Sequence, residues 1–300
     1  MLANFFGKSK PVNFIVIFTL FLGYFFLASF TKGVSLETVK ELFWFIVVFS
    51  IFNFIITKNQ LTYDNSYAFL FYTLLIGFFT EVIQLNSLFY ANVTVLLFLR
   101  KVYSLQSSKK IIHKLFDGGL WLGISFLIEP YTAIFGFLLY ASIYLHQRFT
   151  YQTLLTPVLG FLGPILLYFT YHFWYDSVNN FNQLFLWYSN YNFDFYFENN
   201  HIFTLTLTGI GTVLALLIKS PKALSVKNLF RKNWILILIH LFSAGFIVVL
   251  IDNKQMSELL FLFFPTAIVL TNGIELITKK WLVDIVLSLF LILSFIFIFV

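Results

Sequence analysis

Four glutamates stand at the ends of apolar runs, where their carboxylates could carry out chemistry. Glu37 and Glu41 lie four residues apart, which places both on one side of a helix. Glu81 and Glu129 stand in two later connections between apolar runs. A carboxylate can act as a general base or hold a divalent cation. We therefore predict Glu37, Glu41 and Glu81 as catalytic residues, Glu129 as substrate-binding, and a divalent cation as candidate cofactor. The alternative is that these acids are solvated helix ends.

The segment from Trp174 to His201 is dense in aromatic and asparagine side chains. Aromatic faces stack on sugar rings while amides hydrogen-bond to hydroxyl groups, so this segment could hold a sugar or a lipid headgroup. The alternative is an interfacial segment whose Trp and Tyr side chains lie at the level of lipid headgroups. Besides Glu129, the substrate-binding candidates are Trp174, His172, Trp187, Tyr188, Asp194 and His201.

Several other classes of site are excluded by the residues present. The chain has no cysteine, which removes disulfides, thiolate metal sites and cysteine nucleophiles. None of its five histidines has the spacing of a histidine metal site, and His240, inside an apolar run, is expected to hydrogen-bond across helices. There is no phosphate-binding loop, nucleophile elbow or nucleic-acid module. We predict no metal-ligating residues and no nucleic-acid partner.

The elements that must position these residues are helices in a lipid bilayer. The chain is 60% apolar and only 11% charged, whereas soluble domains carry about 25% charged residues. The fold prediction is an all-α polytopic transmembrane bundle, a single transmembrane domain over residues 1–300. The eleven predicted spans lie near 12–30, 42–57, 66–80, 87–99, 117–129, 131–146, 153–173, 201–218, 234–251, 258–277 and 282–300.

The predicted span near 153–173 contains two prolines and two glycines that are expected to affect its geometry and packing. Pro157 and Pro164 are expected to interrupt it, because each removes a backbone hydrogen bond. Gly160 and Gly163 are expected to let another helix approach closely.

Cationic side chains orient the predicted spans. With strict alternation, all of the 19 Lys and Arg residues except Lys32, Lys40 and Lys254 fall on one side, which the positive-inside rule makes cytoplasmic. The N-terminus is then cytoplasmic and the C-terminus outside, with most acids and the Trp174–His201 segment at the outer face. The net charge of +6 is largely explained by this topology. The alternative is that the basic loops Arg100–Lys114 and Lys219–Lys232 bind anionic lipid or a phosphate-bearing partner.

Two parts of the sequence resemble known families. The opening residues Phe5–Phe14 are similar to a family of Bacteroidota inner-membrane proteins with no assigned activity. The stretch Gly118–Tyr171, with Glu129-Pro130, His146-Gln147-Arg148 and Gly160-Phe161-Leu162-Gly163-Pro164, resembles the middle of the C-superfamily of integral-membrane glycosyltransferases.

The second resemblance implies an enzyme that takes a sugar from a polyprenyl-phosphate donor at the outer face of a bacterial inner membrane. It implies that Glu37 or Glu41 is the catalytic acid of the first outer loop and Glu81 the acid of the next. The base deprotonates an acceptor hydroxyl that attacks the anomeric carbon. The implied partners are membrane lipids, polyprenyl phosphate and other envelope membrane proteins. The first outer loop is shorter here than in those enzymes and has no pair of adjacent acids.

Two further functions remain alternatives. The chain could be a non-enzymatic scaffold or subunit of a cell-envelope complex, with the aromatic segment docking another protein. It could also be a transporter, which needs polar side chains inside its spans. The few that this sequence offers are Glu275, Asp284, His240, Asn53 and Asn272.

Overall fold

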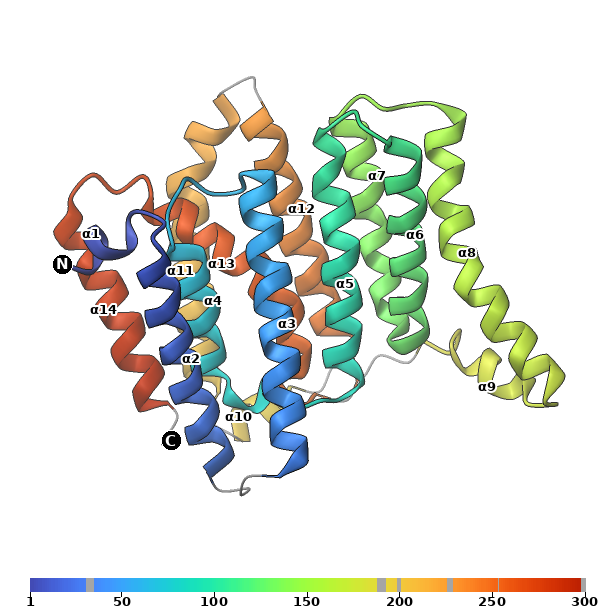
Figure 1. Ribbon diagram of the computed structural model, residues 1–300, viewed down its shortest axis with the longest axis horizontal. Coiled ribbons are helices and arrows are strands. Elements are labelled where there is room, and N and C mark those ends of the chain that lie inside the picture. The colour runs from blue at the N-terminus through green and yellow to red at the C-terminus, as the bar shows by residue number, and fades with distance from the viewer. Residues whose placement is uncertain (31–34, 188–192, 199–200, 226–228, 253, 298–300) are drawn as a thin grey trace. The chain divides into compact units, whose positions relative to one another are not determined.

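The computed structural model describes the chain except for residues 31–34, 188–192, 199–200, 226–228, 253 and 298–300. In the described part, the regular secondary structure is all helical and contains no strand (Figure 1). This confirms the all-α prediction, and it is the expected outcome for a chain in lipid, where a helix satisfies its own backbone hydrogen bonds.

Each predicted span coincides with a helical segment. In chain order these are α2 (Pro11–Phe30), α3 (Leu36–Asn59), α4 (Tyr67–Phe78), α5 (Ser87–Tyr103), α6 (Ile111–Ile128), η3 (Pro130–Phe135) continuing as α7 (Gly136–Leu145), α8 (Tyr151–Trp174), α11 (Ile202–Ser225), α12 (Leu229–Leu250), α13 (Leu260–Ile274) and α14 (Lys280–Ile296). The short helices between them are α1 (Leu2–Phe6), η1 (Thr80–Val82), η2 (Ser104–Gln106), α9 (Val178–Gln183), α10 (Asp194–Glu198) and η4 (Ser257–Leu259).

Length and composition separate these helices into two groups. Among the described residues, eight helices are long and apolar enough to cross a bilayer. They are α2, α3, α5 with η2, α6, α8, α11, α12, and η4 with α13. The segments α4 and η3–α7 are apolar but shorter, and α14 has 17 residues, below the roughly 20 that span a hydrocarbon core.

Contacts within the chain divide it into two compact units. The first unit comprises Met1–Gln84, Phe193–Ile237 and Gln255–Val300. The second unit comprises Leu85–Asn192 and Leu238–Lys254, so the division falls within α12. The prediction of one transmembrane domain stays a prediction, and each unit is described by itself.

The core of the first unit is built around α13, whose residues are almost all buried. It packs against α4 and α11, while α2 and α14 pack against α4. Aromatic side chains join α2, α3 and α4: the ring centroids of Phe21 and Phe49 are 4.8 Å apart, and those of Phe52 and Tyr72 are 4.2 Å apart. Large rings supply the dispersion contacts that hold helices together where lipid offers no hydrophobic driving force.

In the second unit α6 and α8 pack backbone to backbone. A Cβ atom added at Gly160 would lie 2.2 Å from the carbonyl oxygen of Phe116, and one at Gly119 would lie 2.1 Å from that of Pro157. Gly119 and Gly123 form a GxxxG pair on α6, a signal that the sequence analysis missed. The predicted close approach is confirmed for Gly160, whereas nothing lies within 4 Å of a Cβ at Gly163.

Two further expectations have opposite outcomes. The predicted interruption at Pro157 and Pro164 is wrong, because α8 runs unbroken through both prolines from Tyr151 to Trp174. The expected cross-helix hydrogen bond of His240 is confirmed: its Nδ1 lies 3.2 Å from the hydroxyl of Tyr103 on α5, and both side chains are fully buried.

Gly160→Ala is expected to lower the free energy of unfolding by about 1–3 kcal/mol, because the added methyl group must push α6 away from α8. Gly163→Ala is the matched control on the same helix, and we expect it to be neutral or stabilising by up to about 1 kcal/mol. Denaturant unfolding of the purified variants in detergent micelles measures both values. Equal effects of the two substitutions would contradict the α6–α8 contact.

Candidate functional site

One end of the first unit brings together two of the predicted site residues, Glu81 and His201. Helix α4 ends at Phe78, and the chain continues into η1, which carries Glu81. His201 directly precedes α11, and its carbonyl oxygen accepts hydrogen bonds from the first turn of that helix. His201 Nε2 lies 3.6 Å from Glu81 Oε1, and the two side chains are 15% and 43% exposed. We call this the Glu81 end of the first unit.

The surroundings of His201 favour a neutral imidazole at neutral pH. Burial lowers its pKa below the ordinary value of about 6.5, and the charge of Glu81 opposes that shift. The 3.6 Å separation is an ion-pair distance and is longer than a hydrogen bond. A neutral histidine beside a carboxylate, partly open to solvent, is an arrangement suited to accepting a proton.

A second polar contact lies in the same part of the first unit. Glu258 on η4 is fully buried, and its carboxylate accepts hydrogen bonds from the Tyr196 hydroxyl and from the Gln255 backbone N–H, the latter at 3.0 Å. Burial raises the pKa of Tyr196, and the charge of Glu258 adds to that shift. Since η1 and η4 pack against each other, this contact neighbours Glu81.

Sequence reasoning did not nominate Tyr196 or Glu258 as site residues. The available signal was a glutamate opening an apolar run, which would need a partner if that run were buried. The partner, Tyr196, lies 62 residues away in the chain, within the aromatic segment Trp174–His201, but nothing in the sequence pairs it with Glu258.

The other predicted acids of the first unit lie at helix starts. Glu37 is exposed in the first turn of α3, and Glu41 follows one turn later and is half-buried. The N-terminus of α3 is fixed by a capping box between Ser35 and Thr38, and a glutamate in the first turn complements the helix dipole. Asp194 is exposed at the first position of α10. The solvated-helix-end interpretation describes Glu37 well.

Glu129 belongs to the second unit, where it caps the end of α6. The following Pro130 keeps its backbone extended, with φ −141° and ψ 103°. Burial raises the pKa of its carboxyl to about 7; a hydrogen bond from the Tyr131 backbone opposes the shift and the charge of Asp252 adds to it. A carboxyl with this pKa can exchange a proton near neutral pH.

The remaining predicted residues of the second unit take structural and surface positions. His172 is buried at the end of α8, and its Nδ1 lies 2.7 Å from the Ser177 hydroxyl, so it closes the helix C-terminus. Trp174 is 80% exposed and Trp187 is 51% exposed, with the Trp187 ring 5.6 Å from that of Tyr131. Tyr188 lies outside the described residues.

Metal binding gains no support from the described part of the chain, where no group of three His, Asp or Glu side chains could hold an ion. The divalent cation stays a prediction.

The opposite end of the first unit holds a buried charge pair that the sequence analysis did not single out as a site. Lys219 is 18 residues along α11 from His201, or about 27 Å at the rise of an α-helix. Its Nζ lies 3.6 Å from Oε2 of Glu275, at the end of α13, and both side chains are almost fully buried. We call this the Glu275 end.

Glu275 also fixes the connection between α3 and α4. Its Oε1 accepts hydrogen bonds from the Tyr63 backbone N–H at 2.8 Å and from the Asn65 side chain at 2.7 Å. Asn272, one turn earlier on α13, donates to the Leu61 carbonyl at 3.0 Å. The connection is thereby held in one conformation.

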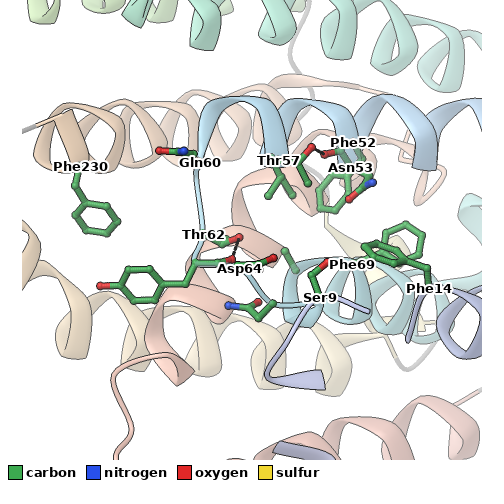
Figure 2. A pocket seen from close by; sticks show the side chains of 14 residues that line it. Ser9, Phe14, Phe52, Asn53, Thr57, Gln60, Thr62, Asp64, Phe69 and Phe230 are labelled. Atoms are coloured by element: carbon green, nitrogen blue, oxygen red, sulfur yellow. Dashed lines mark hydrogen bonds between the residues drawn. The ribbon is translucent and has the colours of Figure 1, made fainter. Parts of the chain in front are cut away.

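Beside this connection lies a cavity of about 430 Å³. Figure 2 shows polar side chains of α3 along one wall and those of the α3–α4 connection facing them, with Phe230 of α12 at one end and Phe14 of α2, Phe52 of α3 and Phe69 of α4 at the other. Its size falls within the range of small-molecule sites.

The long apolar helices make the chain an integral membrane protein. The profile of a family of unknown function (DUF6427) matches residues 1–300, and the chain belongs to this family. No curated protein and no solved structure matches the chain.

We expect the carboxyl of Glu129 to titrate near neutral pH. Because its pKa in the folded protein is raised above the unfolded value, its contribution to stability is complete at acid pH and is lost as pH rises from about 4.5 to about 7. This titration can be followed by infrared spectroscopy, which measures the band of the protonated carboxyl group from about pH 4 to about pH 9. Glu129→Gln should remove the component with a midpoint near 7, while the exposed-site control Glu37→Gln should retain it.

Proposed function

We propose that this integral membrane protein acts on a lipid-linked polar substrate at the Glu81 end, in a glycosyltransferase-like transfer. The observation that carries the proposal is the pairing of His201 with Glu81 across 120 residues of chain, where the Glu81 side chain is 43% exposed. Two residues predicted independently, one as catalytic and one as substrate-binding, here form one acid–imidazole pair.

The pair suggests catalytic roles that differ from those implied by the resemblance, because His201 rather than a glutamate is the base. Glu81 lies beside Nε2 of His201, so a proton carried on Nε2 would face the carboxylate and leave Nδ1 to accept a proton. The oxygen of an acceptor hydroxyl bonds to the anomeric carbon while the bond from that carbon to the phosphate oxygen breaks. The hydroxyl proton passes to His201, and the polyprenyl phosphate leaves with the electron pair. Glu81 then stabilises the imidazolium.

The topology completes the proposal. Eleven spans with a cytoplasmic N-terminus place the Glu81 end at the outer face of a bacterial inner membrane, where lipid-linked sugars are used by the enzymes that this chain resembles. In support, every predicted span coincides with a helical segment, including the three segments that are short.

Glu81→Gln and His201→Gln should each lower the rate of sugar transfer about 100-fold or more, because each removes half of the proton acceptor. Glu37→Gln, which changes an exposed glutamate at the same predicted face, should leave the rate near that of the wild type. The measurement is transfer of labelled sugar from a polyprenyl-phosphate donor by the protein in vesicles. Retention of full activity by Glu81→Gln would count against this site.

A topology test needs no background substitution, because the chain contains no cysteine. Asp176→Cys should react in intact cells with a maleimide that does not cross membranes, and Lys109→Cys should react only after permeabilisation. Both positions are exposed in the structure. Labelling with the reverse pattern, or with the same pattern for both, would refute the proposed orientation.

The scaffold hypothesis is the second candidate and is favoured by a different observation. Trp174, Phe185 and Trp187 are all more than half exposed in the second unit, and exposed aromatic side chains are typical of protein interfaces. For a scaffold, replacing Phe185 and Trp187 by serine would release co-purifying envelope proteins, whereas Glu81→Gln would have no effect.

A further inference from the structure

We propose that the cavity at the Glu275 end of the first unit binds a ligand that carries an ammonium group, held by Asp64 and by the surrounding aromatic rings (Figure 2). This site lies at the opposite end of α11 from Glu81 and His201, and it does not depend on the transfer reaction proposed above.

Asp64 supplies the charge. Apart from the hydroxyl of Tyr63, it is the one ionisable side chain that lines the cavity in the described part of the chain. Asp64 is exposed, and within the same part its carboxylate makes no hydrogen bond and no ion pair with another side chain, so a ligand in the cavity can reach it. The nearest buried acid, Glu275, is already matched by Lys219 and by two hydrogen bonds. A cationic ligand would supply the partner that Asp64 lacks.

Neutral polar side chains add to this recognition. The amide of Asn53 and the side chains of Ser9 and Gln60 line the cavity and make no hydrogen bond to other described residues. Asn53 lies on α3 six residues before the helix ends, which is about 9 Å inside it. A polar side chain at such a depth in a membrane-length helix is costly unless it binds something.

The aromatic walls suit an ammonium group. Phe14, Phe52 and Phe69 line the cavity, and cations are attracted to the faces of such rings. Two rings that line the cavity already make this kind of contact with a lysine. Lys219 Nζ lies 5.1 Å from the centroid of the Tyr63 ring and 4.6 Å from that of the Phe230 ring.

The walls are also held in place before any ligand arrives. Asn13 donates from its side chain to Ser66 Oγ at 3.1 Å and to the carbonyl oxygens of Phe5 and Lys8 at 2.9 Å and 2.6 Å, which joins the turn that carries Ser9 to the start of α4. Together with the Glu275 contacts to Tyr63 and Asn65, these bonds reduce the ordering cost of binding.

Thermal unfolding of the full chain in nanodiscs tests the proposal with two sources of the same chemistry. In discs of phosphatidylglycerol alone, ethanolamine is titrated as the free amine, with ethylene glycol as the uncharged control of similar size. In parallel, discs that also contain phosphatidylethanolamine present the amine as a lipid headgroup. Ligand that binds only the folded protein raises the midpoint in proportion to the logarithm of its concentration.

The proposal predicts that Asp64→Asn weakens amine binding about 10-fold or more, because a charge-assisted contact is lost. Asn53→Ala should also weaken it. Asp176→Asn is the matched control, since it removes an exposed aspartate of the second unit at a left-handed position that asparagine tolerates. Stabilisation by free ethanolamine assigns a soluble amine, and stabilisation only in the mixed discs assigns the lipid.

Three results would overturn the proposal. They are the absence of stabilisation in both arms, an equal effect of ethylene glycol and ethanolamine, and an equal loss of binding in Asp64→Asn and Asp176→Asn. None of these results bears on sugar transfer at the Glu81 end, so the two proposals can fail separately.

Discussion

Hydrocarbon offers a backbone amide no hydrogen-bonding partner, and the placement of nearly every chemically useful residue in this protein follows from that constraint. The chain must be helical wherever it crosses lipid. Irregular backbone, with its free polar groups, is confined to helix ends. Glu81 on η1, Glu129 before Pro130, Asp64 between α3 and α4, and His201 before α11 all stand at such ends.

The polar residues within long helices are the informative exceptions. His240 meets Tyr103, Lys219 meets Glu275, and Asn272 meets the Leu61 carbonyl, so each has a protein partner that offsets its burial. Two of these contacts also anchor the connection between α3 and α4, which shows how a buried polar group can position a loop. Asn53 differs, because its side-chain amide lines a cavity and makes no hydrogen bond to other described residues.

The elements could be predicted from sequence because their cause is local. Runs of apolar residues near the length of a bilayer form helices, and all eleven intervals contain one. The prediction that Pro157 and Pro164 interrupt their span was wrong, since a membrane helix can continue through proline when its neighbours and local adjustments satisfy the freed carbonyls. The close approach of a helix to α8 was predicted from Gly160, but the glycine on the partner helix α6, Gly119, was not recognised.

The sites were harder to predict because their causes are distant in sequence. The candidate acids were identified by residue type, but nothing in the sequence pairs Glu81 with His201 rather than with Glu37 or Glu41. The pairing results from the packing of α4 and α11 against α13, which brings the end of α4 close to the start of α11. The Tyr196–Glu258 contact likewise depends on η4 reaching α10.

The same helices separate the two ends of the first unit by the length of a membrane span, and this separation assigns each end a different kind of chemistry. At the Glu81 end a half-exposed carboxylate meets an imidazole whose pKa is lowered by burial, an arrangement that can accept and release a proton. At the Glu275 end the titratable pair is sealed within the protein and serves as a support, while the group that faces the cavity is a single unpaired carboxylate among aromatic rings. Proton transfer is therefore proposed for the Glu81 end and ligand binding for the Glu275 end, because each end of the first unit brings together the residues that its chemistry needs.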